Sequence, residues 1–446
     1  MAVSVGFISL GCSKNLVDSQ VMAGFLKEGK ISFAETPETA DIIIVNTCAF
    51  IEAAREEAAE AILSVCEHKT NGACKGVVVA GCMVQRYKEQ LLKAFPDVDA
   101  FIGIDELDQV AQVIDRVAQG ERCGVLAKQG PAKKVYNPAY PTLLFTGGPF
   151  SYLKIADGCN HRCAYCAIPL IRGNFRSRDI DAIVNEAQSM INAGVKEINL
   201  ISQDSLMYGA DHGGKPLIVE LVQRLDQLKG DFWLRILYGY PAGVTPALID
   251  LFNRAKHLVK YLDLPIQHSH PEILTAMNRG KAIEATTTLA ERLRAAIPGV
   301  TLRTTCLVGF PGETTSHVKH LEAFLKKAQF DHVGVFVYSP EEGTAADAWE
   351  APDEKVANAR AKKLMDLQKT IVETRLATLK GTTTTAVLLR QKNASTWIGR
   401  TPRQAPEVDG ETLIKNVPPT AKAGDFISIV ITGGEGYDLH AKACMP

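Results

Sequence analysis

Residues 156–173 read ADGCNHRCAYCAIPLIRG and place Cys159, Cys163 and Cys166 at x3 and x2 spacing. Thiolates at such close spacing are ligands of iron–sulfur clusters and of zinc. A structural zinc site needs a fourth protein ligand, normally from a second cysteine pair, and the chain contains no second Cys-x2-Cys pair. Three close thiolates instead suit a four-iron cluster whose fourth iron is open to an exogenous ligand. The alternative is a loop stapled by zinc.

The cysteine stretch directly follows the first of six strand-like runs, most of which are separated by helical patterns. Six βα units are too few for a closed eight-unit barrel, so the pattern predicts a partial (β/α)6 barrel of the TIM type. In such barrels the chemistry lies in the loops after the carboxyl ends of the strands. The predicted strands are SYLKIA (151–156), EINLIS (197–202), FWLRIL (232–237), YLDLPI (261–266), TLRTTCLV (301–308) and VGVFVYS (333–339).

The amino-terminal part alternates short apolar strands with helical stretches such as Glu52–Cys66. Strand–helix–strand alternation predicts a Rossmann-like α/β domain with a parallel sheet. Residues 120–150 are rich in proline and glycine and are typical of an interdomain linker. The predicted strands are SVGFISL (4–10), ADIIIVN (40–46) and KGVVVAG (75–81).

The carboxyl-terminal part begins with a long polar helix predicted over residues 351–380. Short strand-like runs divided by Gly, Pro and Asp follow, and they predict a small antiparallel, OB-like β-barrel. These five runs cover residues 383–391, 395–401, 411–416, 425–433 and 437–443. We therefore expect three domains, over residues 1–130, 145–378 and 379–446.

Three other cysteines are scattered in sequence but repeat one placement. Cys12, Cys48 and Cys82 each stand at the end of a predicted strand of the first domain. The carboxyl ends of parallel strands share one edge of a sheet, so these thiols can converge on a second cluster. Taken singly, each is better read as a buried core thiol, and it is the threefold repeat of the placement that favours a ligand set. The five cysteines without this placement are expected to be ordinary thiols: Cys66, Cys74, Cys123, Cys306 and Cys444.

The amino-acid composition excludes several classes of protein. The chain has 446 residues, of which 46% are hydrophobic and 22% charged, and this balance excludes a disordered chain. The formal net charge of −1 excludes a strong chain-wide attraction to nucleic acid or to anionic membranes. No stretch approaches the apolar length that a membrane span requires, so we expect a cytoplasmic protein. Thiols are kept reduced there, which favours ligands over disulfides for the eleven cysteines.

The cysteine stretch on the first loop of a six-unit βα barrel resembles the radical SAM superfamily. In that superfamily the open iron binds S-adenosylmethionine (SAM), and reductive cleavage yields a 5′-deoxyadenosyl radical. Two cysteine sets followed by a small β-barrel resemble the methylthiotransferases of this superfamily, over essentially the whole chain. These enzymes join an auxiliary-cluster domain, a radical SAM core and a TRAM domain. Further matching motifs are SLGCSKNLVDSQ (9–20), VNTCAFIEAAREEA (45–58), GCMVQRY (81–87), LPIQHSHPEILTAMNRG (264–280), RTTCLVGFPGET (303–314), GVFVYSPEEGT (334–344) and GRTPRQAPEVDG (399–410).

The sequence after the first cysteine distinguishes two branches of this family. Here it is Ser13-Lys14-Asn15, whereas the branch that modifies transfer RNA usually has Gln-Met-Asn. The resemblance therefore implies methylthiolation of the β-carbon of an aspartate in ribosomal protein S-twelve. The alternative substrate is a tRNA base of the N6-isopentenyladenosine type. Residues 381–446 carry seven basic and six acidic residues, a net charge of +1, which fits a basic protein partner better than an RNA backbone. Nucleic-acid binding is thus not expected to be primary.

The resemblance also implies cofactors and partners. Two 4Fe–4S clusters are expected, an auxiliary one on Cys12, Cys48 and Cys82 and a radical SAM one on the other set. One SAM would donate a methyl group and another would supply the radical. An electron donor such as flavodoxin or ferredoxin and a sulfur donor are implied as well. No acid–base pair is required, because such catalysis does not attack an unactivated C–H bond.

Polar residues at other strand ends are weaker candidates. The SAM contacts expected from their position are Gln203, Asp204, Arg235 and Gln267. A satisfied polar group at the end of a barrel strand is the competing interpretation. A basic group beside the cysteine loop either contacts substrate or forms a solvent-exposed face, and comprises Arg172, Arg176 and Arg178.

Overall fold

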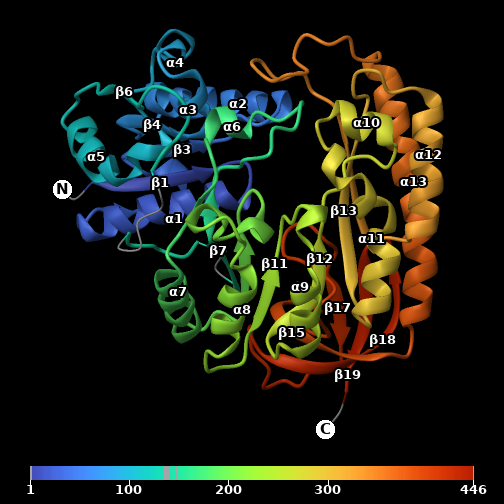
Figure 1. The fold of residues 1–446 in the computed structure, drawn as a ribbon. Helices are drawn as coiled ribbons and strands as arrows, with labels where there is room; N and C mark the ends of the chain where they lie inside the picture. The colour runs from blue at the N-terminus through green and yellow to red at the C-terminus, as the bar shows by residue number, and fades with distance from the viewer. Residues whose placement is uncertain (1–2, 135–139, 146–147, 445–446) are drawn as a thin grey trace. The chain divides into compact units, whose positions relative to one another are not determined.

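The computed structural model describes residues 3–134, 140–145 and 148–444 (Figure 1). The chain forms two compact units. The first comprises Met1–Phe145, Lys154–Asp179 and Ser339–Asp347. The second comprises Thr146–Leu153, Ile180–Tyr338 and Ala348–Pro446.

The first unit is built on a parallel sheet with the strand order β2-β1-β3-β4-β5-β6. The runs of Ile and Val in its two central strands, β3 and β4, are buried along their whole length, as expected of a parallel sheet covered on both faces. The strands are β1 (Ser4–Ser9), β2 (Ser32–Phe33), β3 (Ile42–Thr47), β4 (Gly76–Gly81), β5 (Ala100–Ile102) and β6 (Gly124–Leu126).

Helices cover both faces of this sheet, because alternate residues of each strand point to opposite sides. Ile43 of β3 packs in one core with Ile62 of α2 (Glu52–Asn71). Ile42 packs in the other core with Met22 of α1 (Ser13–Glu28) and with α5 (Val110–Ala118). Figure 1 shows α1 and α2 on opposite sides of β1 and β3. The Rossmann-like prediction is confirmed.

Smaller elements complete the first unit. Two short helices, α3 (Cys82–Tyr87) and α4 (Gln90–Ala94), follow β4. A two-stranded ladder, β8 (Ala156–Asp157) and β9 (Arg176–Ser177), frames the cysteine loop, within which lies α6 (Ile168–Ile171). The 3-10 turns are η1 (Pro37–Thr39) and η2 (Ile104–Gln109).

The predicted linker is partly regular structure. Residues 124–126 form β6, which pairs in parallel with β5 at the edge of the first sheet. This strand has only three residues among glycines and polar residues, so it leaves no alternating pattern in the sequence. Residues 135–139 and 146–147, also within the predicted linker, lie outside the described residues.

The second unit contains a six-stranded sheet with the order β14-β13-β12-β11-β10-β7. Each strand from β10 to β14 pairs in parallel with the next, as the partial barrel predicts. The fourth strand begins three residues earlier than predicted and ends at Asp263, ahead of Pro265. The strands are β7 (Phe150–Lys154), β10 (Glu197–Ile201), β11 (Trp233–Ile236), β12 (Leu258–Asp263), β13 (Thr301–Val308) and β14 (His332–Val337).

Helices follow these strands along the chain. The longer ones are α7 (Ile180–Asn192), α8 (Ile218–Asp226), α9 (Pro246–Arg254), α10 (Pro271–Ala276), α11 (Ile283–Ala296) and α12 (Thr315–Ala328). The predicted polar helix is α13 (Glu354–Leu379). The 3-10 turns of this unit are η3 (Ser205–Met207), η4 (Ala210–His212), η5 (Pro241–Gly243) and η6 (Gly280–Ala282).

The five carboxyl-terminal strands close into a barrel of order β15-β16-β17-β19-β18 around a small apolar core. The barrel is not wholly antiparallel, because β17 and β19 pair in parallel. Neighbours around a closed ring can all alternate in direction only when their number is even, so five strands require one parallel pair. The strands are β15 (Thr383–Asn393), β16 (Thr396–Arg400), β17 (Thr412–Lys415), β18 (Phe426–Glu435) and β19 (Asp438–Ala443).

No helix in the described part of the chain combines the length and the apolar character needed to cross a membrane.

Candidate functional site

The first cysteine set lies at one edge of the first sheet. Cys12 is the N-cap of α1, Cys48 directly follows β3, and Cys82 is the first residue of α3. The strands that precede them, β1, β3 and β4, are neighbours in the sheet. The three strand ends that carry these cysteines therefore lie side by side at one edge of the sheet.

Contacts among the strand ends show how close these residues lie. A Cβ atom built on Gly11 would be 2.7 Å from Cβ and 3.1 Å from Sγ of Cys48. The Asn15 Nδ2 group donates to the Thr47 carbonyl at 2.9 Å and to the Leu10 carbonyl at 3.2 Å. The Asn15 Oδ1 atom accepts from the Cys82 thiol at 3.3 Å. One amide thus ties together the ends of all three strands.

The three thiols differ in their exposure to solvent. Cys48 and Cys82 are buried, whereas Cys12 is exposed, so the set has an open side. Burial raises the pKa of the Cys82 thiol to about 12 and raises that of Cys48 as well. Such thiols become thiolates when a metal displaces the proton, and three of them at one sheet edge with an exposed side fit an iron–sulfur cluster.

A glycine with a left-handed backbone precedes Cys82. Gly81 has φ +95°, and a Cβ atom there would lie 2.2 Å from Asn46 Oδ1 and 2.9 Å from the Thr47 carbonyl oxygen. Only glycine is compatible with both the backbone angle and the space. The tight turn from β4 into α3 therefore fixes where the Cys82 sulfur lies.

The second cysteine set lies on the loop between β8 and β9. The Cys159 N–H donates to the Gly173 carbonyl at 3.0 Å, which closes the base of the loop. The Cys166 N–H donates to the Cys163 carbonyl at 3.0 Å and forms a turn between the last two cysteines. Asn160 Oδ1 accepts from the Phe175 N–H at 3.0 Å. Cys159 is buried, and Cys163 and Cys166 are half-buried, so this loop is folded yet accessible.

All six cysteines belong to the first compact unit. The predicted domain limits place the two sets in different domains, whereas residues 154–179 belong to the same compact unit as the amino-terminal sheet. Residues 339–347 belong to the same unit, and the Ala346 N–H donates to the Ala164 carbonyl at 2.9 Å, within the cysteine loop. Glu341 fixes this segment through Arg55 at 2.5 Å and Arg86 at 2.7 Å.

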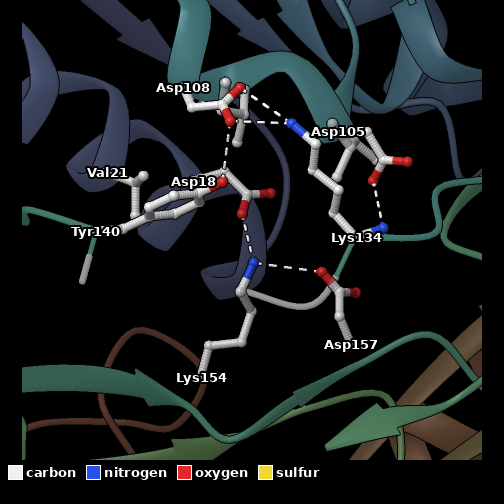
Figure 2. A pocket seen from close by; sticks show the side chains of 10 residues that line it. Asp18, Val21, Asp105, Asp108, Lys134, Tyr140, Lys154 and Asp157 are labelled. Atoms are coloured by element: carbon white, nitrogen blue, oxygen red, sulfur yellow. Dashed lines mark hydrogen bonds and ion pairs between the residues drawn. The ribbon is translucent and has the colours of Figure 1, made fainter. Parts of the chain in front are cut away.

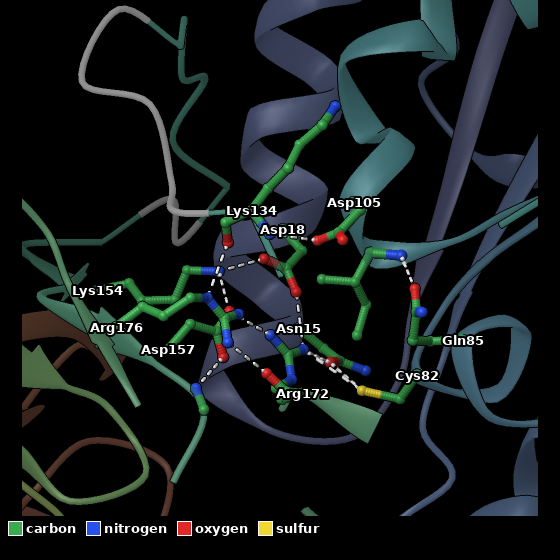
Figure 3. A network of polar contacts seen from close by, with 12 residues as sticks. Asn15, Asp18, Cys82, Gln85, Asp105, Lys134, Lys154, Asp157, Arg172 and Arg176 are labelled. Carbon is green, nitrogen blue, oxygen red and sulfur yellow. Dashed lines mark hydrogen bonds and ion pairs between the residues drawn. The ribbon is translucent and has the colours of Figure 1, made fainter. Parts of the chain in front are cut away.

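The buried Arg172 contacts both Cys82 and Asp157, which lies two residues before Cys159 (Figure 3). The Arg172 Nη2 atom lies 3.3 Å from the Cys82 sulfur, 2.7 Å from Asn15 Oδ1 and 2.8 Å from Asp18 Oδ2. Its Nη1 atom lies 2.9 Å from Asp157 Oδ2, two residues before Cys159. The side chain of Arg172 is therefore a physical link between the two cysteine loops.

Lys154 and two carboxylates complete this ionic group. Lys154 Nζ contacts Asp18 Oδ1 at 2.5 Å and Asp157 Oδ2 at 3.3 Å. Burial would raise the pKa of Asp157, but the charges of Arg172 and Lys154 outweigh it and hold that pKa below its ordinary value. The four groups thus carry two positive and two negative charges.

A small polar cavity adjoins the ionic group (Figure 2). Its volume of about 30 Å³ has room for a water molecule or two and is far too small for SAM. In Figure 2 the Lys134 ammonium points to Asp108, and the Tyr140 hydroxyl donates to the same carboxylate. The lining residues are Asp18, Val21, Ile104, Asp105, Leu107, Asp108, Lys134, Tyr140, Lys154 and Asp157.

The basic group predicted beside the cysteine loop is not a solvent-exposed face. Arg172 is 1% and Arg178 is 2% exposed, so that interpretation is wrong for both. The Arg178 Nη1 atom donates to the Lys154 carbonyl at 2.7 Å. Arg176 is half-buried and donates to the carbonyl oxygens of Lys134 and Arg172.

The predicted SAM contacts lie in the second unit. Gln203 and Asp204 follow β10, and Asp204 Oδ1 accepts from the N–H groups of Leu206 at 3.2 Å and Tyr240 at 3.1 Å. Gln267 follows β12 with φ +69°, and its N–H donates to the Thr305 carbonyl at 2.8 Å. Both places are at the carboxyl ends of barrel strands.

Arg235 has different surroundings. It is fully buried, and its Nε atom pairs with Glu197 Oε1 at 2.8 Å. Its Nη1 and Nη2 atoms donate to the carbonyl oxygens of Pro402 at 2.9 Å and Gln404 at 3.2 Å. These contacts join a barrel strand to the carboxyl-terminal domain. The Arg235 side chain therefore stabilises the packing of these two parts.

Comparisons with known proteins give matches along nearly the whole chain. Three family profiles match in succession: "Uncharacterized protein family UPF0004" at residues 4–103, "Radical SAM superfamily" at 153–325 and "TRAM domain" at 381–444. A protein from Pelotomaculum thermopropionicum, named "Ribosomal protein uS12 methylthiotransferase RimO", is 39% identical over 100% of both chains. The chain belongs to the RimO family.

Other members of the RimO family match equally broadly. Proteins of the same name from Trichlorobacter lovleyi and Crocosphaera subtropica are 41% and 42% identical, over 98% and 97% of this chain and 97% of each relative. Among solved structures, the radical SAM methyltransferase TsrM from Kitasatospora setae has a TM-score of 0.56 at 14% identity, covering 78% of this chain and 77% of that one. At that identity the likeness shows the fold.

Sequence reasoning missed the residues that surround the sulfurs in this RimO-family chain. No metal-ligand motif points to these residues, which are Asn15, Asp18, Lys154 and Asp157. Lys154 contacts Asp18 across 136 residues, and Arg172 contacts Asn15 across 157. The available signals were Asn15 and Asp18 shortly after Cys12 and the Asp157-Gly158 pair directly before Cys159, because polar residues next to cluster ligands often orient them.

Proposed function

We propose that this chain is a radical SAM methylthiotransferase that modifies the β-carbon of an aspartate in ribosomal protein S-twelve. The full-length similarity to the RimO family carries this conclusion. The meeting of Cys12, Cys48 and Cys82 at one sheet edge, in the same compact unit as the second cysteine set, supports it independently.

The cofactors are SAM and 4Fe–4S clusters, which when bound supply the methyl group and the radical that removes hydrogen from the substrate carbon. We assign Cys12, Cys48 and Cys82 to the auxiliary cluster. We assign Cys159, Cys163 and Cys166 to the radical SAM cluster. The exposed Cys12 and the half-buried Cys163 and Cys166 support these assignments, because both clusters need an accessible side.

For SAM itself we retain Gln203, Asp204 and Gln267, which stand at carboxyl ends of barrel strands where barrel enzymes bind their ligands. We also propose domain limits of 1–130, 145–378 and 379–446, action in the cytoplasm, an electron donor such as flavodoxin or ferredoxin, and a separate sulfur donor. The profile matches support these domain limits.

The deciding experiment is anaerobic turnover of the reconstituted enzyme with ribosomal protein S-twelve and, separately, with isopentenylated tRNA. We expect mass spectrometry to show one added methylthio group on the protein and none on the tRNA. A gain by the tRNA alone would overturn the choice of substrate while leaving the chemistry in place.

Metal analysis tests the chemistry separately. Two four-iron clusters predict about eight irons per chain after anaerobic reconstitution. Stoichiometric zinc with little iron would instead identify a metal-binding protein without radical chemistry.

A further inference from the structure

Arg172 is a full positive charge with almost no access to water. Its side chain is 1% exposed, and burial of an unpaired guanidinium would cost several kcal/mol. A guanidinium stays protonated in proteins, so the charge is retained. A charge buried to this extent requires oppositely charged or hydrogen-bonding partners.

The carboxylates that hold Arg172 already balance its charge. Asp18 and Asp157 each contact both Arg172 and Lys154, so two anions face two cations. All four side chains are at most 7% exposed. The ionic group is therefore neutral by itself, and its contact with Cys82 is an additional interaction rather than part of its charge balance.

The contact with Cys82 has a fixed geometry. Arg172 Nη2 reaches the sulfur at 3.3 Å while the same nitrogen contacts Asn15 and Asp18 at 2.7 and 2.8 Å (Figure 3). A planar guanidinium held at both ends cannot rotate away from the sulfur. One of the two Nη2 N–H groups is thus shared between the sulfur and an oxygen, and it is held toward the thiolate that Cys82 becomes as a ligand.

The same residue is anchored to the other cysteine loop. Asp157 Oδ1 accepts from the Gly158 N–H at 2.9 Å, while Oδ2 accepts from Arg172. On the other side, the Gly173 carbonyl next to Arg172 accepts from the Cys159 N–H. Hydrogen bonds therefore join the loop that carries Cys159 to the guanidinium that contacts Cys82.

We propose that Arg172 is a positioning residue that donates a hydrogen bond to the Cys82 thiolate and thereby raises the reduction potential of the auxiliary cluster. This inference rests on the proposed function. Hydrogen bonds to the sulfurs and local charge set the potential of iron–sulfur clusters, and a donor stabilises the more negative, reduced form. The anchoring at Asp157 makes that potential depend on the geometry of the radical SAM loop.

The test uses the full chain with Cys159, Cys163 and Cys166 replaced by alanine, so that only the auxiliary cluster is bound. Arg172→Met is introduced into this parent, and the midpoint potential is measured by an EPR-monitored redox titration alongside iron content. We expect about four irons in both proteins and a more negative midpoint in Arg172→Met. Arg172→Lys keeps the charge without the planar fork, so we expect a smaller negative shift.

Lys154→Met is the matched control. It removes an equal charge from the same four groups but leaves the Arg172 side chain, so its midpoint should shift less than that of Arg172→Met. Equal midpoints in the parent and Arg172→Met, or equal shifts in Arg172→Met and Lys154→Met, would overturn the role of Arg172. If Arg172→Met does not fold, an unshifted Arg172→Lys overturns it. A parent that binds no iron would instead contradict the proposed function.

Discussion

At the scale of single residues, the side-chain amide of Asn15 holds the strand ends of the first cysteine set together, and one cysteine of the set is exposed to solvent. Asn15 reaches the ends of β1 and β3 with its NH₂ group and the Cys82 thiol with its oxygen. Cys12 stands apart because it is exposed, whereas the other two thiols are buried. Replacing Cys12 therefore removes a proposed ligand without leaving a cavity in a core.

We expect Cys12→Ala to abolish methylthio insertion while leaving reductive SAM cleavage largely intact. The auxiliary cluster loses a ligand, and the second cysteine set lies on a different loop. Iron content should fall from about eight to about four per chain, and 5′-deoxyadenosine should still form. Cys123→Ala, which removes a half-buried thiol outside both sets, serves as the control and should retain both activities. Loss of SAM cleavage in Cys12→Ala would show that the two sets are not separable.

The sequence indicated the candidate cysteines, which follow a repeated pattern, but not the residues whose contacts join distant parts of the chain. Two sets of cysteines could be recognised because each has a local spacing or a repeated position at strand ends. The contacts of Arg172 with Asn15 and Asp18 span more than 150 residues, so no local periodicity reports them. Its burial was not apparent either, since three arginines within seven residues resemble an exposed basic face.

At the scale of elements, the turn from a strand into a helix places the sulfur. At Gly81, between β4 and α3, a Cβ atom would collide with Asn46 and with the carbonyl oxygen of Thr47. The side chain of Asn46 also donates to Ser19 and to the Asn15 carbonyl, at 2.8 and 2.7 Å, so it has little room to move. The turn that carries Cys82 is consequently rigid.

Gly81→Ala should therefore displace Cys82 and destabilise the first unit. We expect auxiliary-cluster iron to be lost and the thermal midpoint of unfolding to fall. Gly194→Ala is a matched control, because φ there is +92° but no atom lies within 4 Å of the new Cβ. That variant carries only the cost of the left-handed backbone, about 1–2 kcal/mol, and should keep its iron. Equal iron content in the two variants would contradict a steric role for the turn.

Strands were predictable where several β-branched residues follow one another. β3, β4 and β13 lie within two residues of their predicted limits for this reason. β12 was placed three residues late, because the apolar pattern continues past Asp263 to Leu264 and Ile266. The parallel pairing of β17 with β19 could not be read from strand patterns, since it follows from closing a ring of five strands.

At the scale of whole domains, the radical SAM barrel and the TRAM barrel belong to one compact unit. Glu197 of β10 lies where they meet and is 0% exposed. It pairs with Arg235 of β11 at 2.8 Å and with Arg400 of β16 at 2.6 Å. One carboxylate is therefore the shared counter-charge of two buried guanidinium groups from two domains.

Glu197→Gln should destabilise the second unit, because it leaves Arg235 and Arg400 buried without their counter-charge. Breaking a buried pair from one side costs about 3–5 kcal/mol. The urea midpoint of unfolding at pH 7 should fall accordingly. Glu411→Gln removes an exposed partner of Arg390 at 3.4 Å and is the control, with an expected change within about 0.5 kcal/mol.

Acidification should reduce the difference between wild type and Glu197→Gln. Burial raises the pKa of Glu197, but Arg400 and Arg235 outweigh it and hold the pKa below its ordinary value of 4.5. The ionised carboxylate thus contributes its full stabilisation above pH 4.5, and this contribution is lost as the pH falls through the lowered pKa. Urea midpoints measured from pH 7 down to pH 3 should show the gap between the two proteins constant at first and narrowing below pH 4.5. A gap that widens on acidification would mean that Glu197 is not the charged partner of the two arginines.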